Sequence, residues 1–170
     1  MILWRIIAIF TLAASSSQSL ALIEGQVLMG QRSSSSGELD YKGTENKLSV
    51  YLDPIPLVPV GFGVTMAQAT VTTEVLGAEV EQKQSETTLD VTAWLPMGIA
   101  GFKPYAKLGY VVAGKYESST DVSGTKMAAG LRYSPLPLFG VMLELEKSAM
   151  KLGEASIDNM GILLGAYAGI

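Results

Sequence analysis

The sequence predicts an all-β fold, an eight-stranded antiparallel up-and-down transmembrane β-barrel. Apolar residues alternate with small or polar ones through most of the chain. All prolines fall in three segments, 54–59, 96–104 and 135–137, and proline is expelled from strand interiors into turns and edges. The chain is also apolar, with 48% hydrophobic and 16% charged residues. No stretch after residue 21 has the ~18 consecutive apolar residues that a transmembrane helix needs, so we expect the membrane to be crossed by strands.

Residues 1–21 are predicted to be a secretory signal peptide. Arg5 precedes an apolar core, 6–14, and Ser19-Leu20-Ala21 fits a small-x-small cleavage site. Cleavage there leaves 22–170 as a single barrel domain. The alternative is an uncleaved N-terminal anchor.

The first three strands are predicted at 22–32, at 45–53 and from residue 60. Each has an apolar face of alternate residues: Ile23, Val27 and Met29; Leu48, Val50 and Leu52; Phe62, Val64 and Met66. Serine and glycine are frequent in 33–43, which predicts a loop. Residues 70–86 keep a strand pattern but are more polar, so we expect a β-hairpin that protrudes beyond the membrane.

Five more strands complete the predicted barrel. They are expected at 87–95, 103–116, 124–134, 139–146 and 159–170, with polar loops at 117–123 and 148–158. The strand at 103–116 is expected to place Ala106, Leu108, Tyr110 and Val112 on one face and Tyr105, Lys107, Gly109 and Ala113 on the other. Compact proline turns at one end and longer polar loops at the other are typical of bacterial membrane barrels.

Aromatic residues near the proline segments predict a girdle at the level of the lipid headgroups. They are Tyr51, Trp94, Phe102, Tyr105, Tyr133 and Phe139.

The polar face of the strands predicts a lumen filled by small residues and paired ions. The interior of eight strands is just wide enough for side chains to fill it, and buried charges must be paired. The expected ion network consists of Glu24, Arg32, Lys47, Asp90, Lys107, Lys126, Arg132, Glu144 and Glu146. Strand pairing is expected to bring Lys126 near Glu146, and Asp90 near Lys107.

With this alternation and its C-terminal segment, Leu164-Gly-Ala-Tyr-Ala-Gly-Ile170, the chain resembles the small outer-membrane barrels of Gram-negative bacteria, of the outer membrane protein A transmembrane domain and outer membrane protein X type. The resemblance covers the whole of 22–170. It implies a location in the outer membrane, with outer-membrane lipid and the barrel-assembly machinery as partners. Ile170 departs from the terminal aromatic residue that is usual in that family.

Candidate catalytic residues are few. The chain has no histidine and no cysteine, so histidine-based triads and thiolate metal sites are excluded. Ser123-Gly-Thr-Lys126 matches a nucleophile motif, but its partner motifs are missing. Two carboxylate pairs, Glu79 with Glu81 and Glu144 with Glu146, each share a strand face. We expect no catalytic residue, no cofactor and no metal, and the net charge of −4 argues against nucleic-acid binding.

The sequence therefore predicts a non-enzymatic outer-membrane barrel. Its role would be envelope structure, surface recognition of a ligand through the outer loops, or both. The first alternative is a secreted, soluble, lipocalin-like barrel that binds a small apolar ligand. A narrow channel and a histidine-free lipid-modifying enzyme are the third possibility.

Overall fold

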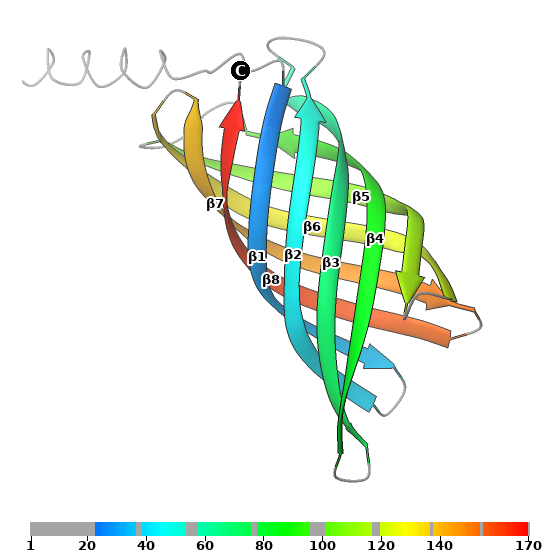
Figure 1. Ribbon diagram of the computed structural model, residues 1–170. Coiled ribbons are helices and arrows are strands. Elements are labelled where there is room, and N and C mark those ends of the chain that lie inside the picture. The colour runs from blue at the N-terminus through cyan, green and yellow to red at the C-terminus, as the bar shows by residue number, and fades with distance from the viewer. Residues whose placement is uncertain are drawn as a thin grey trace, which may run out of the picture.

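The computed structural model is a closed barrel of eight strands (Figure 1). It describes residues 23–36, 39–53, 58–75, 78–95, 101–116, 120–136, 138–153 and 155–169. The predicted signal peptide lies outside these residues. No helix in the described ranges is long and apolar enough to cross a bilayer.

The strands are antiparallel and follow chain order around the barrel, which β1 and β8 close. They are β1 (Ile23–Ser36), β2 (Leu39–Leu52), β3 (Val60–Val75), β4 (Ala78–Trp94), β5 (Phe102–Tyr116), β6 (Thr120–Leu136), β7 (Phe139–Leu152) and β8 (Ala155–Gly169). The predicted fold class is confirmed. The start of β1 and the end of β8 lie at the same end of the barrel as the proline-containing connections (Figure 1).

The strands extend further from the proline end than the sequence predicted. Most of the expected loop at 33–43 belongs to β1 and β2, and much of 117–123 and 148–158 is strand as well. The longer gaps between strands are instead 53–59 and 95–101, at the proline end. The prediction of compact proline turns was wrong for these two connections but right for the third, because only 137–138 separate β6 from β7. Pro104 and Pro135 lie within β5 and β6, near the ends of these strands, where proline is tolerated. At the other end Ser and Thr continue the strands, because a hairpin neighbour supplies backbone partners.

The predicted protruding hairpin is confirmed and consists of the ends of β3 and β4. Its pairing runs to Val75 opposite Ala78. On one side β2 pairs with β3 only as far as Thr72, and on the other β5 pairs with β4 only from Gln84. The hairpin therefore extends beyond its neighbours (Figure 1).

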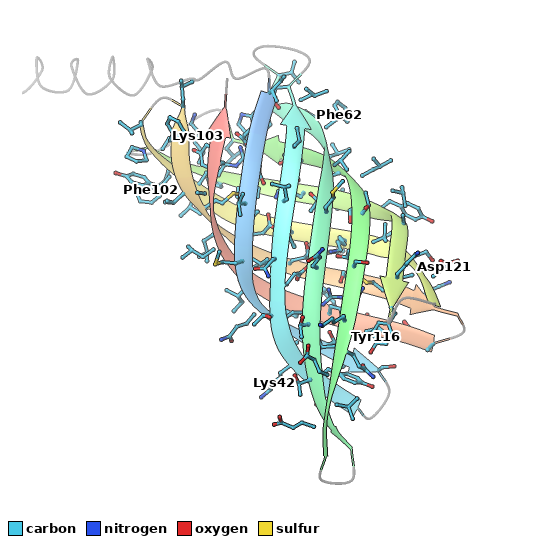
Figure 2. All side chains as sticks on the ribbon, in the orientation of Figure 1. Lys42, Phe62, Phe102, Lys103, Tyr116 and Asp121 are labelled. Carbon is cyan, nitrogen blue, oxygen red and sulfur yellow. The ribbon has the colours of Figure 1, made fainter. Side chains whose placement is uncertain are left out.

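Most large apolar side chains of the described strands are exposed on the outside of the barrel. Figure 2 shows side chains that project outward around it. Leu108, Leu164 and Ile162 are 66%, 63% and 58% exposed. The outward apolar residues of β8 run from Met160 to Ala168, which corresponds to roughly 20 Å along the barrel axis for a strand rise of about 3.3 Å and a tilt of about 40°. That height is close to the ~25 Å apolar band of outer-membrane barrels.

The predicted aromatic girdle was only half right. Phe102, Tyr133 and Phe139 face outward, and the first two stack with ring centroids 4.7 Å apart. Tyr51 and Tyr105 are buried inside the lumen, and Trp94 packs against the same interior cluster. The reason is strand parity, because these three residues occupy the face that carries the charges.

Candidate functional site

The lumen holds a network of charged side chains. Five cations and six carboxylates face inward, and all are largely buried: Arg32, Lys47, Lys107, Lys126 and Arg132 with Glu24, Glu45, Glu86, Asp90, Glu144 and Glu146. The set includes the nine residues named from the sequence. Glu45 and Glu86 are additional.

Glu144 on β7 has partners on two other strands. Its Oε2 lies 2.6 Å from Lys107 Nζ and accepts a 2.9 Å hydrogen bond from the Tyr105 hydroxyl. Its Oε1 accepts a 3.3 Å hydrogen bond from Lys47 Nζ. One side chain therefore connects β2, β5 and β7 through the interior.

Lys126 on β6 forms a second group of ion pairs. It lies 3.2 Å from Glu146, the pairing expected from the sequence, and 3.6 Å from Glu45. It also pairs with Glu86. Because Glu146 pairs with Lys47 as well, the two groups form one network.

Asp90 lies near Lys107 as expected, since both line the same small cavity, but Asp90 has no ion pair with this lysine within 4.0 Å. It lies opposite Gly109 in β5, so the lysine is two residues away along that strand. Lys107 instead donates to Gln26 Oε1 at 2.9 Å and pairs with Glu144. Asp90 Oδ2 accepts hydrogen bonds from two hydroxyl groups, that of Tyr51 at 3.2 Å and that of Thr65.

An aromatic cluster closes the lumen at the proline end. The Arg132 guanidinium lies 4.8 Å from the ring centroid of Tyr105 and 5.2 Å from that of Tyr167, distances at which a cation and a ring attract. Its Nη1 donates to Glu24 Oε2 at 3.0 Å. Leu28, Met142 and Leu163 fill the space around these rings.

An apolar cluster closes the other end. It consists of Val111, Val122 and Met150, with Tyr116 packed against it. Arg32 lies between this cluster and the ions, with Nη2 3.7 Å from Met150 Sδ and Nη1 3.7 Å from Glu45 Oε1. The charged layer is therefore enclosed between two layers of packed side chains.

Little empty space is left inside. The cavity within the network has a volume of about 10 Å³, about enough for a single water molecule. Thr88 and Asp90 line it together with three lysines. In the described part of the chain no cluster of His, Cys, Asp or Glu is arranged to hold a metal ion.

Glycines make room for the lumen tyrosines. Tyr51, Tyr105 and Tyr167 lie directly opposite Gly63, Gly130 and Gly140 on the neighbouring strands. A Cβ atom added to Gly130 would be 2.5 Å from the Tyr105 ring, and one added to Gly140 would be 2.5 Å from the Tyr167 ring. Glycine is therefore required at these positions for packing, although it lowers intrinsic strand stability.

The other candidate residues do not form a catalytic arrangement. Ser123 is exposed on the outer face, whereas Lys126 is buried in the lumen, so the two side chains of the apparent motif point in opposite directions. Glu79 and Glu81 are exposed on the protruding hairpin. Glu144 and Glu146 face lysines.

Strand parity could have identified the two missing carboxylates. Glu45 is two residues from Lys47, and Glu86 is four from Asp90, so each shares the inward face of its strand. Glu86 was assigned to the protruding hairpin, and Glu45 was the first residue of a predicted strand. The hydrogen bonds from hydroxyl groups to Asp90 could not be predicted in this way, because strand parity does not show which neighbouring side chains reach the carboxylate.

Comparisons with known proteins find similarity in structure alone. No family model matches the sequence, and no curated protein matches it. Neisserial surface protein A superposes with a TM-score of 0.72 at 13% identity, over 87% of this chain and 97% of that one. The outer membrane protein OprG of Pseudomonas aeruginosa gives 0.59 at 15%, over 90% and 98%.

A third similar structure is Ail, the attachment invasion locus protein of Yersinia pestis, in complex with the heparin analogue sucrose octasulfate. It gives a TM-score of 0.51 at 15% identity, over 85% of this chain and 98% of that one. At such identities the likeness concerns the fold. This chain has the fold of the small eight-stranded outer-membrane β-barrels.

Proposed function

We propose that this chain is a non-enzymatic barrel of a Gram-negative outer membrane that contributes to envelope structure and offers its outer hairpins for surface recognition. The observation that carries the proposal is the direction of the side chains. Leucine, isoleucine and valine form an exposed belt, while lysine, arginine and glutamate fill the interior. In water this arrangement would expose a large apolar surface, whereas in a bilayer the belt contacts lipid. We therefore propose outer-membrane lipid as a partner that contacts the belt. The barrel-assembly machinery, which the resemblance implies as a second partner, stays a prediction.

The soluble, lipocalin-like alternative fits the side chains poorly. A carrier of apolar ligands needs a cavity of several hundred Å³ lined by apolar groups. The described lumen instead contains an ion network around a cavity of about 10 Å³. The apolar residues that could have lined a ligand site are on the outside.

A lipid-modifying enzyme and an open channel are also less well supported. Glu144 and Glu146 are held by lysines, which leaves neither free to accept a proton from a substrate. A path for water would have to cross the packed layers at both ends of the network. Aqueous channels are typical of barrels with many more strands.

The β3–β4 hairpin is the best recognition element. From Ala78 to Lys83, β4 has no register partner on β5, and an unpaired strand edge can accept an extended segment of another protein. Glu79 and Glu81 are exposed there, so a segment with basic residues would be favoured. Removing the three cross-strand pairs nearest the tip, 73–75 with 78–80, keeps the register. It halves the unpaired edge and removes Glu79, so it should weaken recognition without unfolding the barrel.

The polyanion bound by Ail is not a good guide to a ligand here. Beyond the apolar belt the described outward charges are balanced, with five lysines and five carboxylates. They are Lys42, Lys83, Lys115, Lys147 and Lys151, with Asp40, Glu79, Glu81, Asp121 and Asp158. A heparin-like ligand would require an excess of positive charge.

Cysteine labelling tests location and orientation together, because the chain contains no cysteine. Glu81→Cys places a thiol on the protruding hairpin, and Val58→Cys places one at the proline end. In intact cells a membrane-impermeant maleimide should label the first variant alone. After permeabilisation both should react.

Two results would contradict the proposal. Labelling of Val58→Cys but not Glu81→Cys in intact cells would reverse the orientation and remove the recognition role. Recovery of both variants in the supernatant after ultracentrifugation would exclude the membrane location. A barrel that fractionates with membranes should also migrate differently on gels before and after boiling.

A further inference from the structure

A hollow of about 670 Å³ lies in the outer wall of the barrel. Residues of β3, β4, β5 and β6 line it, at the place where the β3–β4 hairpin and the β5–β6 hairpin diverge (Figure 1). Its volume is within the range of small-molecule binding sites. Most of its lining residues are exposed on the outside of the barrel. Residues with buried side chains, among them Glu86, Val111 and Val122, also border it.

The strand β5 contains a β-bulge beside the hollow, with one more residue than the facing part of β4. Val111 pairs with Thr88 and Ala113 with Thr87, so Val112 has no counterpart on β4. Pairing with β6 is interrupted over 112–114. Val112 and Ala113 both face outward as a result, whereas a regular strand would alternate.

The lining of the hollow changes from apolar to polar along the barrel axis. Its part nearer the proline end is formed by the exposed side chains of Met66, Tyr110 and Val112. The part nearer the outer hairpins contains Gln68, Ser85, Lys115, Asp121 and Ser123. Figure 2 shows Asp121 on the outer part of the β5–β6 hairpin.

This gradient has the direction that a lipid has in the outer leaflet, with its chains toward the membrane centre and its headgroup toward the outer hairpins. Met66 is also the last outward apolar residue of β3 before Gln68, so the hollow lies at the edge of the apolar belt. Water cannot fill its apolar part without cost, and the molecules available at this level are membrane lipids. Asp121 lies opposite Lys115 on β6, but in the described part of the chain no ion pair within 4.0 Å involves Lys115. Its ammonium group can therefore meet a phosphate.

We propose that the hollow at the Val112 bulge binds one lipid of the surrounding leaflet, with an acyl chain against Met66, Tyr110 and Val112 and an anionic headgroup at Lys115. The inference rests on the proposed membrane location and adds a defined lipid site to it. The bulge at Val112 then forms part of the lipid-binding site. The lipid would cover backbone groups of 112–114 that lack a strand partner on β6.

Deleting Val112 tests the role of the bulge. Without it, Ala113 follows Val111, and both the β4–β5 and the β5–β6 registers become continuous. The inward positions of Val111 and Tyr116 are kept, so the barrel should still close while the hollow is lost. Val112→Trp is a second variant, which fills the hollow and leaves the register unchanged.

Val27→Trp is the matched control. Val27 is 52% exposed on the outer face of β1, and Val112 is 49% exposed on that of β5. The two strands are on opposite sides of the closed barrel. Both substitutions therefore add the same side chain to the same apolar belt.

The measurement is native mass spectrometry of barrels extracted from vesicles of phosphatidylglycerol and phosphatidylcholine. The wild type and Val27→Trp should retain one lipid, whereas the Val112 deletion and Val112→Trp should show an about tenfold smaller lipid-bound fraction. Lys115→Gln should reduce the preference for phosphatidylglycerol about threefold. Gel mobility before and after boiling reports separately whether each variant has folded in the membrane.

Equal lipid retention by the wild type and both Val112 variants would overturn the proposal, and so would equal loss in Val27→Trp. Retention of detergent instead of phospholipid would also reject a leaflet lipid as the occupant. If folded, membrane-inserted wild type retains no lipid, the lipid site is wrong and the proposed location stands. If the wild type is not in the membrane at all, the proposed location is wrong.

Discussion

Lys107 Nζ lies 2.6 Å from Glu144 Oε2, although the two residues are on strands that do not pair with each other. The same oxygen accepts a hydrogen bond from the Tyr105 hydroxyl, and Lys47 donates to the other oxygen from β2. Glu144 therefore holds strands together through the lumen, in addition to the backbone ladder. A buried ion pair of this kind is costly to break, because the remaining charge stays buried without compensation.

Glu144→Gln should destabilise the barrel strongly. The substitution keeps the shape of the side chain but removes the negative charge shared by Lys47 and Lys107. The expected loss is about 3–5 kcal/mol. It should appear as a lower temperature for the change from the compact to the unfolded gel mobility.

Glu81→Gln is the control for this change. Glu81 is exposed, and its lysine partner, Lys83, lies 3.8 Å away on the surface. An exposed pair contributes less than about 1 kcal/mol, so the transition temperature should barely change. Equal effects of the two substitutions would show that the lumen network adds no stability.

Gly130→Ala should destabilise the barrel through crowding. Its Cβ would meet the backbone oxygen of Leu143 on β7 and would be 2.5 Å from the Tyr105 ring and hydroxyl. Both the neighbouring strand and the ring beside Glu144 would have to shift. Overpacking of this kind costs about 1–3 kcal/mol. The same gel transition measures it.

Gly25→Ala is the matched control, because the nearest atom to its added Cβ is 4.0 Å away. This substitution should leave stability unchanged or raise it slightly, since alanine reduces the entropy of the unfolded chain. If Gly130→Ala behaved in the same way, the close packing of glycine against tyrosine would not be required.

Much of the fold followed from alternation in the sequence, because the period of two fixes which side chains face lipid. Glu24, Lys47 and Glu144 could be placed in the lumen for this reason. Alternation does not determine register, however. Asp90 and Lys107 were expected near each other, and both line the same cavity. They are nevertheless offset along β4 and β5, and Lys107 pairs with Glu144 on β7 instead.

The bulge also escaped prediction. Ala113 was expected on the inner face of its strand, together with Lys107 and Gly109, but it faces outward because Val112 is inserted before it. A one-residue insertion between two apolar residues leaves no local mark, since Val112 and Ala113 suit either face. The register of the neighbouring strands is what reveals it.

The barrel should not conduct ions in planar bilayers. The charged layer lies between the Arg132 cluster and the apolar cluster of Val111, Val122 and Met150. The barrel should be reconstituted at a protein amount at which a sixteen-stranded porin gives clear current steps. Stepwise currents from the barrel at neutral pH would contradict a sealed lumen. The recording should therefore include such a porin as a positive control.

Asp53→Asn should stabilise the barrel at alkaline but not at acidic pH. Asp53 follows β2 at the proline end, where partial burial and the negative charge of Glu24 raise its pKa to about 6, against the opposing effect of Arg132. The folded state therefore favours the protonated carboxyl. This contribution to stability is complete below about pH 4 and is lost as the pH rises through about 6.

At pH 8 the charged Asp53 disfavours the folded state, and asparagine removes that effect. Because Asp53 is half-exposed, solvent screening reduces the expected gain to about 1 kcal/mol. The gel transition temperature of Asp53→Asn should thus exceed that of the wild type at pH 8 and match it at pH 4. Asp121→Asn removes one negative charge at the opposite end and controls for net charge. A gain of equal size at both pH values would mean that the ionisation of Asp53 is not its cause.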